Sequence, residues 1–216
     1  MQKFLKGRID LVKSLLNSSL DFHYADCVLI LCGVLSACAS IRWPGKEKID
    51  RRRFIELLIN HSSPDFHTSW ISVPSLLNGG LICKDQTLYG KPGNDTRIYC
   101  DNEIDISLED AKKKYPDVLP NKIRQNCYAF LIYERLRCGY SHEYCPGESI
   151  THIPPSKRDA RISYIGRLTN GKIKRMIGFH LDYLISLSEY HVSILPNTCS
   201  SRPSCWWIDK YKTNKS

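Results

Sequence analysis

Hydrophobic positions recur at helical intervals along most of the chain. In residues 3–20, apolar side chains are spaced three to five positions apart with lysines between them, which predicts an amphipathic helix. Similar periodicity predicts further helices over residues 26–43, 49–60 and 179–195. The longest predicted helix begins near Asn121 and continues without proline as far as Pro146. We therefore expect a mainly α fold.

Two regions depart from this pattern. Residues 61–120 are rich in turn-forming glycine, proline and asparagine and show little helical periodicity, which predicts an irregular insert with short strands near residues 81–83 and 97–100. Asn170-Gly171 lies between two β-capable runs and predicts a β-hairpin over residues 162–177. The C-terminal tail, residues 197–216, has no clear period. We expect a single domain, residues 1–216, built as a helical bundle with a hairpin and an insert.

The composition is that of an ordinary folded domain. With 216 residues, 42% hydrophobic and 25% charged, the chain is long enough for one substantial core, and collagen-like, coiled-coil and disordered classes are excluded. A strongly apolar run without charged residues, Cys27 to Ile41, has 15 residues. As a helix it would be about 22 Å long against a bilayer core of about 30 Å. We expect a buried core helix and no membrane association.

The N-terminal residues and the cysteines bear on the compartment. The first 20 residues scatter lysine and arginine through an amphipathic pattern, unlike a secretory signal, so we expect a cytoplasmic protein. Four of the ten cysteines sit in apolar runs, where thiols pack as small hydrophobic groups: Cys27, Cys32, Cys38 and Cys127. The chain has no C-x-x-C pair, P-loop or G-x-G-x-x-G motif. We therefore expect no metal and no cofactor; a site made of Cys138, His142 and Cys145 is a weaker alternative.

The charge is concentrated toward the C-terminus. The net charge is +9, and residues 121–216 carry 15 basic and 7 acidic side chains. An excess of this size favours a polyanionic partner, nucleic acid first, because lysine and arginine release condensed counterions when they bind it. A triplet of arginines, Arg51–Arg53, can follow phosphates in the same way. A solubilising surface explains the charge equally well.

An arginine and a histidine lie five positions apart on the longest predicted helix. They belong to the segment Arg137-Cys138-Gly139-Tyr140-Ser141-His142. This segment and the order of helices around it resemble the HEPN superfamily, an all-helical family with an R-x4-6-H motif whose members include many metal-independent ribonucleases of toxin, antiphage and RNA-processing systems. Arg175 and His180 have the same spacing but straddle a predicted strand-to-helix junction.

The chemistry of RNA cleavage gives these two residues separate roles. Attack by the ribose 2′-hydroxyl needs proton transfers and positive charge against the phosphorane. Histidine suits the proton transfers, and arginine holds phosphate oxygens with its planar fork. We therefore predict that Arg137 and His142 are catalytic. Basic and aromatic side chains near the motif and on the hairpin are predicted to bind RNA: Arg135, Tyr140, Arg167, Lys174 and Arg175.

The spacing also bears on assembly. Five helical positions leave Arg137 and His142 about 140° apart around one helix, so they do not share a face. The resemblance implies a homodimer with a composite cleft, and an antitoxin or regulatory protein as a possible partner. Cys138 stands where many catalytic members of the family have a polar residue.

Several alternatives stay open at this point. The first is a non-catalytic HEPN-like module that binds RNA, nucleotide or protein. The second is a protein-binding helical domain whose insert docks a partner. A structural role for the motif is also open, in which Arg137 pairs with Glu134 or Glu143 and His142 stabilises the helix end.

Overall fold

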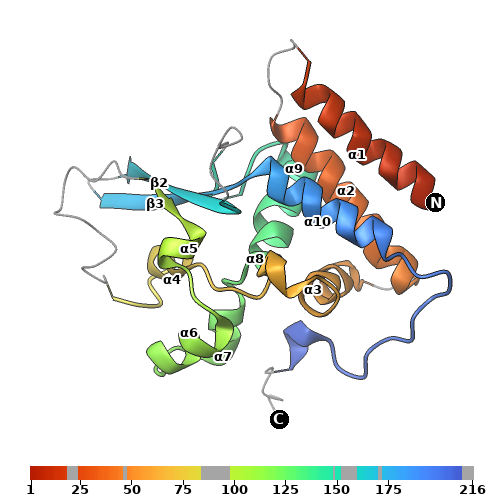
Figure 1. Cartoon of the computed structure of the whole chain (residues 1–216). Helices are drawn as coiled ribbons and strands as arrows, with labels where there is room; N and C mark the ends of the chain where they lie inside the picture. The colour runs from red at the N-terminus through yellow and green to blue at the C-terminus, as the bar shows by residue number, and fades with distance from the viewer. Residues whose placement is uncertain are drawn as a thin grey trace.

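The structure, a computed structural model, describes residues 1–18, 24–45, 48–83, 98–147, 149–151, 160–169 and 172–210. Helices dominate these residues, and a small antiparallel sheet lies to one side of them (Figure 1). The predicted mainly α class is therefore confirmed.

Helix α2 (Tyr24–Arg42) is the central element. It is apolar on nearly every side, and such a helix must be enclosed by others. Three helices pack around it, α1 (Gln2–Leu16), α3 (Asp50–Asn60) and α10 (Leu181–Ser193), together with the segment that carries the motif (Figure 1). These four helices confirm the predictions made from periodicity, to within a few residues at each end.

Helix α2 is also, among the described residues, the one helix long and apolar enough to cross a membrane by length and composition alone. In the structure it is a core helix. Leu31 and Leu35 on its inner side have no exposed surface.

The four cysteines of the apolar runs are buried and unpaired, as predicted. Burial raises the pKa of three of these thiols, Cys32, Cys38 and Cys127, to about 12. These thiols therefore stay protonated at neutral pH and act as small hydrophobic groups.

The long helix predicted from Asn121 was wrong. The structure divides it into α7 (Pro120–Arg124), α8 (Tyr128–Leu131), the π-helical turn η2 (Ile132–Arg137) and α9 (Cys138–Glu143). The break lies at Gln125–Cys127, where the backbone pairs with the insert. Cys127 is extended and forms a β-bridge with Ile71, and the Asn126 carbonyl accepts a hydrogen bond of 3.0 Å from the Ser72 N–H. A tertiary contact has overridden the local helical pattern.

The predicted insert, residues 61–120, contains only short elements where the structure describes it. These are η1 (Pro64–Phe66), α4 (Val73–Asn78), β1 (Tyr99–Cys100), α5 (Asp101–Ile104) and α6 (Leu108–Lys114). The strand expected near residues 81–83 was wrong, because turns and bends follow α4 there. The strand expected at 97–100 is present as β1, while residues 84–97 lie outside the described part.

The predicted hairpin is confirmed. Strand β2 (Ile162–Thr169) pairs antiparallel with β3 (Lys172–Phe179), and β1 adds a third strand on the far edge of β2. The Asn170-Gly171 turn lies outside the described residues. The hairpin is tied to the central helix, because the Tyr24 hydroxyl donates a hydrogen bond of 2.7 Å to the Phe179 carbonyl.

The C-terminal tail, described as far as residue 210, is mostly exposed or half-buried but is anchored to the core by Trp207. Trp207 is buried, and its backbone N–H donates a hydrogen bond of 2.6 Å to the Glu56 carboxylate on α3. The Arg124 guanidinium donates to the Trp207 carbonyl at 2.6 Å and lies 3.9 Å from the centroid of the Trp207 ring. The absence of periodicity had hidden these contacts, because single aromatic side chains rather than a helical face anchor this segment.

A buried carboxyl group joins the insert to the helices and the sheet. Asp105 accepts hydrogen bonds from the Val73 N–H at 3.0 Å, from the Tyr128 hydroxyl at 2.5 Å and from the Tyr164 hydroxyl. Burial raises the pKa of Asp105 to about 7, although these three donors favour the charged form and oppose the shift. The folded protein therefore holds a proton that the unfolded chain would release at lower pH.

This proton makes stability depend on pH. Because the pKa of Asp105 is raised in the folded state, the free energy of unfolding falls as pH rises from about 4 to 7. We expect Asp105→Asn to remove this decline and to cost about 1–3 kcal/mol, since an amide cannot accept all three donors. Urea unfolding at pH 5 and pH 7.5 measures both effects. Asp10→Asn, an exposed change on α1, is the control; an unchanged pH slope in Asp105→Asn would contradict the assignment.

Candidate functional site

The motif lies where the π-helical turn passes into α9. Arg137 is the last residue of η2, and His142 lies in the final turn of α9. Ile132, Leu136 and Tyr140 are buried at intervals of four, so one side of this segment faces the core. Arg137 lies beside that buried row and is half-buried, whereas His142 is exposed.

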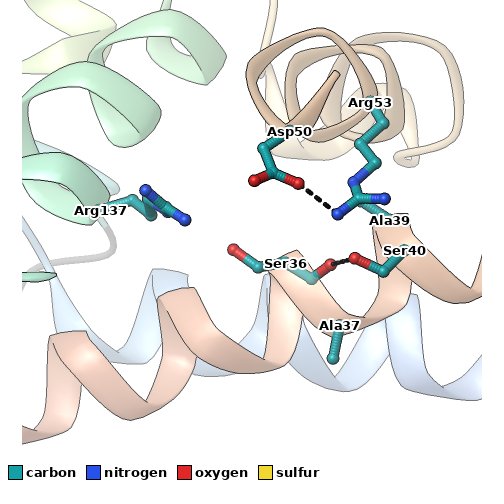
Figure 2. A pocket seen from close by; sticks show the side chains of 7 residues that line it. All are labelled: Ser36, Ala37, Ala39, Ser40, Asp50, Arg53 and Arg137. Carbon is teal, nitrogen blue, oxygen red and sulfur yellow. Dashed lines mark hydrogen bonds and ion pairs between the residues drawn. The ribbon is translucent and has the colours of Figure 1, made fainter. Parts of the chain in front are cut away.

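A pocket opens beside Arg137, between η2, α2 and α3 (Figure 2). It encloses about 230 Å³, and seven residues line it: Ser36, Ala37, Ala39, Ser40, Asp50, Arg53 and Arg137. Arg137 extends from its helix toward Asp50 and Ser36 on the opposite walls (Figure 2). Two guanidinium groups and one carboxylate give the pocket a net positive charge.

The two arginines of the pocket have different partners. Arg53 forms an ion pair with Asp50 and donates a hydrogen bond of 3.4 Å to the Trp43 carbonyl. Arg137 lies 5.4 Å from the centroid of the Tyr133 ring, and its Nη1 is 4.0 Å from the Cys138 sulfur. Within the described ranges, no carboxylate forms an ion pair with Arg137. Its charge is therefore available to an incoming anion.

The alternative in which Arg137 pairs with Glu134 or Glu143 is not seen among the described residues. Glu134, one of the two proposed partners, forms an ion pair of 2.7 Å with Arg51. Glu143, the other, is exposed in the last turn of α9. Arg137 therefore does not act as one half of an ion pair on the helix surface.

His142 does not line the pocket that contains Arg137. Arg137 ends the π-helical turn and His142 lies in the α-helix that continues directly from it, so the sequence-based separation of about 140° around the helix applies. The imidazole is exposed and makes no hydrogen bond with any residue of the described ranges. One chain therefore presents the arginine and the histidine in different directions.

Gly139 lies between the two motif residues at a point where the chain folds back. A Cβ atom at this position would come within 2.6 Å of the Cys145 carbonyl oxygen and 2.7 Å of the Gly147 nitrogen. The Gly147 N–H donates a hydrogen bond of 2.8 Å to the Arg135 carbonyl, which holds the returning segment on the helix. Only glycine leaves space for this close approach.

The structure corrects two of the predicted RNA-binding residues. Tyr140 is 2% exposed, and its ring packs at 6.3 Å, centroid to centroid, from that of Tyr24, so it cannot stack on a base. Arg175 is also 2% exposed and lies 4.6 Å above the Tyr99 ring on the covered face of the sheet. In the second R-x4-H pair, His180 is buried as well and hydrogen-bonds the Ser163 hydroxyl at 2.7 Å.

The other predicted RNA-binding residues lie apart from each other. Arg135 is half-buried on η2, under Gly147. Arg167 and Lys174 are cross-strand partners on the hairpin, and Arg167 is exposed. The hairpin meets α2 at Tyr24, and Ser36 lies about 18 Å farther along that helix. Since the hairpin extends away from the helices (Figure 1), its basic residues do not join the Arg137 pocket.

Sequence reasoning missed most of the pocket. Ser36 and Ser40 of α2 and Asp50 in the first turn of α3 were not predicted, whereas Arg53, in the same turn, belongs to the arginine triplet noted in the sequence. The sequence does contain one indication of the pocket. Ser36 and Ser40, four positions apart and so on the same side of the helix, interrupt the apolar α2 segment, which indicates that this side faces a polar environment.

Comparisons with known proteins add no family assignment. No protein-family model, no curated protein and no solved structure matches this chain. Across the described residues, no group of three or more histidine, cysteine, aspartate or glutamate side chains is arranged to hold a metal ion.

Two glycine substitutions test the close approach at the motif. We expect Gly139→Ala to destabilise the fold by about 1–3 kcal/mol, because the methyl group would meet backbone atoms that cannot move independently. Gly33→Ala on α2 is the matched control, since nothing lies within 4 Å of its Cβ position. This change should leave stability equal or raise it by about 0.5–1 kcal/mol. Chemical unfolding measures both, and equal stability of the two variants would refute the close approach.

Proposed function

We propose that this protein is a metal-independent endoribonuclease of the HEPN type. The observation that carries the proposal is the position of Arg137: it extends into an open pocket with no carboxylate partner in the described residues. The net positive charge, concentrated after residue 121, favours the same partner, a polyanion such as RNA. A role in a toxin or antiphage system would follow from the resemblance alone.

The proposed reaction divides the work between two residues. The Arg137 guanidinium binds the scissile phosphate and stabilises the extra negative charge of the phosphorane. His142, as imidazolium, donates a proton to the leaving 5′-oxygen. The products are a 2′,3′-cyclic phosphate and a 5′-hydroxyl, and no metal ion takes part.

A homodimer would bring the two residues together. Within one chain Arg137 enters the pocket while the exposed His142 is directed elsewhere. In a symmetric pair, the histidine of each copy can complete the arginine pocket of the other, which gives two equivalent composite sites. We therefore propose the homodimer as the active form.

The second candidate is a non-catalytic RNA-binding module. It is favoured by the same divergence of Arg137 and His142, and by Cys138, because a thiol is a weak hydrogen-bond donor where a polar side chain would assist catalysis. In that case RNA binds at the arginine pocket with strong salt dependence and stays intact.

Cleavage assays in EDTA test the proposal. Purified protein should cut single-stranded or structured RNA and leave 2′,3′-cyclic phosphate ends. Arg137→Ala and His142→Ala should each lower the rate by about 10²–10⁴-fold. Arg8→Ala, an exposed change on α1, should leave it unchanged. Salt-sensitive binding without cleavage would support the module instead, and cleavage unaffected by His142→Ala would refute the catalytic assignment.

Mixing the two inactive variants tests the composite site. If each site takes its arginine and its histidine from different copies, co-expressed Arg137→Ala and His142→Ala chains should regain about a quarter of the wild-type activity. Half of the dimers then carry both variants, and each of these has one intact site. No recovery would indicate that both residues act from the same chain.

A further inference from the structure

We infer that Asp50 is the general base that removes the proton from the attacking 2′-hydroxyl. This inference rests on the proposed ribonuclease function. In that function Arg137 binds the phosphate and His142 protonates the leaving oxygen, but no residue is yet assigned to take the proton from the 2′-hydroxyl. The assignment of Asp50 is drawn from the lining of the Arg137 pocket and not from the motif.

Asp50 and Arg137 belong to the same pocket. Asp50 lies at the start of α3 and Arg137 at the end of η2, and Figure 2 shows both side chains directed into the space between them. A phosphate held by Arg137 would have its neighbouring ribose within this space. The Asp50 side chain is 54% exposed and accessible to a ligand.

Arg53 fixes the orientation of this carboxylate. The Arg53 side chain is 14% exposed, and its guanidinium forms the ion pair with Oδ1 of Asp50. No residue of the described ranges donates a hydrogen bond to Oδ2, and in Figure 2 the oxygen outside the dashed line is turned toward Arg137. The structure therefore holds one oxygen in place and leaves the other open to a donor such as a ribose hydroxyl.

The remaining lining residues cannot accept this proton. Alanine has no polar side-chain atom, arginine stays protonated, and the neutral hydroxyls of Ser36 and Ser40 are too weakly basic to take up a proton. Asp50 is the one carboxylate among the residues that line the pocket. It follows that the group best placed to act as a base beside Arg137 is Asp50.

The step balances without any further reactant. The O–H bond of the 2′-hydroxyl breaks and its proton moves to Oδ2 of Asp50, while the 2′-oxygen forms a bond to phosphorus. The bond from phosphorus to the 5′-oxygen then breaks, and that oxygen takes a proton from His142. A carboxylate base and an imidazolium acid thus act on opposite sides of one phosphate.

A change of leaving group separates the base from the acid. The substrate is RNA in which sulfur replaces the 5′-oxygen at the main cleavage position, because a thiolate leaves without a proton. His142→Ala should recover at least tenfold on this substrate relative to ordinary RNA. Asp50→Asn should remain about 10²-fold or more below the wild type on both substrates, since the 2′-hydroxyl must still lose its proton.

Three controls keep the result specific. Asp10→Asn removes an exposed carboxylate from α1, and this variant should cut RNA at the wild-type rate. Thermal unfolding of Asp50→Asn should match the wild type within a few degrees. Binding of the same RNA with a 2′-deoxy residue at the cleavage position should be as tight or tighter in Asp50→Asn, because the loss is in kcat and not in binding.

The outcomes distinguish a failure of Asp50 as the general base from a failure of the proposed ribonuclease function. Wild-type rates in Asp50→Asn, recovery of that variant on the sulfur substrate, or a matching loss of binding would each refute Asp50 as the base while the ribonuclease stands. If neither Arg137→Ala nor His142→Ala changes cleavage, the proposed function fails, and Asp50 loses its role with it.

Discussion

The burial of α2 is the constraint on which the rest of the structure depends. A 19-residue helix that is apolar on nearly all sides is stable in water only when other elements cover it, and α1, α3, α10 and the motif segment do so. The polar interruption at Ser36 and Ser40 is placed where α3 and η2 do not close completely. The pocket therefore results from the way the core is enclosed.

Periodicity was a sound guide wherever a helix packs by one face or is wholly buried. Helices α1, α2, α3 and α10 were predictable for this reason, and the hairpin was predictable from the β-capable runs on either side of Asn170-Gly171. The long helix was not, because Cys127 bridges to Ile71, more than fifty positions away, and no local pattern contains that contact. Trp207 was missed for the same reason.

The residues of the candidate site also fall into those that local sequence indicates and those that only tertiary packing brings together. Arg137 and His142 were proposed from their spacing; Arg137 lines the pocket, and His142 is exposed. Tyr140 and Arg175 are buried beside Tyr24 and Tyr99, which come from distant parts of the chain and are not revealed by the motif's spacing. Asp50 and Arg53 meet Arg137 only after α3 packs on α2. Local sequence thus identified the motif, and tertiary packing supplied its surroundings.

The π-helical turn that ends at Arg137 affects how such motifs are compared between proteins. A π turn closes its hydrogen bonds over one residue more than an α turn, and each residue turns the helix by about 100°. A homologue that lacked this one residue would keep the arginine, the histidine and their spacing, yet would direct both toward different neighbours. Alignments that match the motif alone would score the two proteins as equivalent although different side chains would line their pockets.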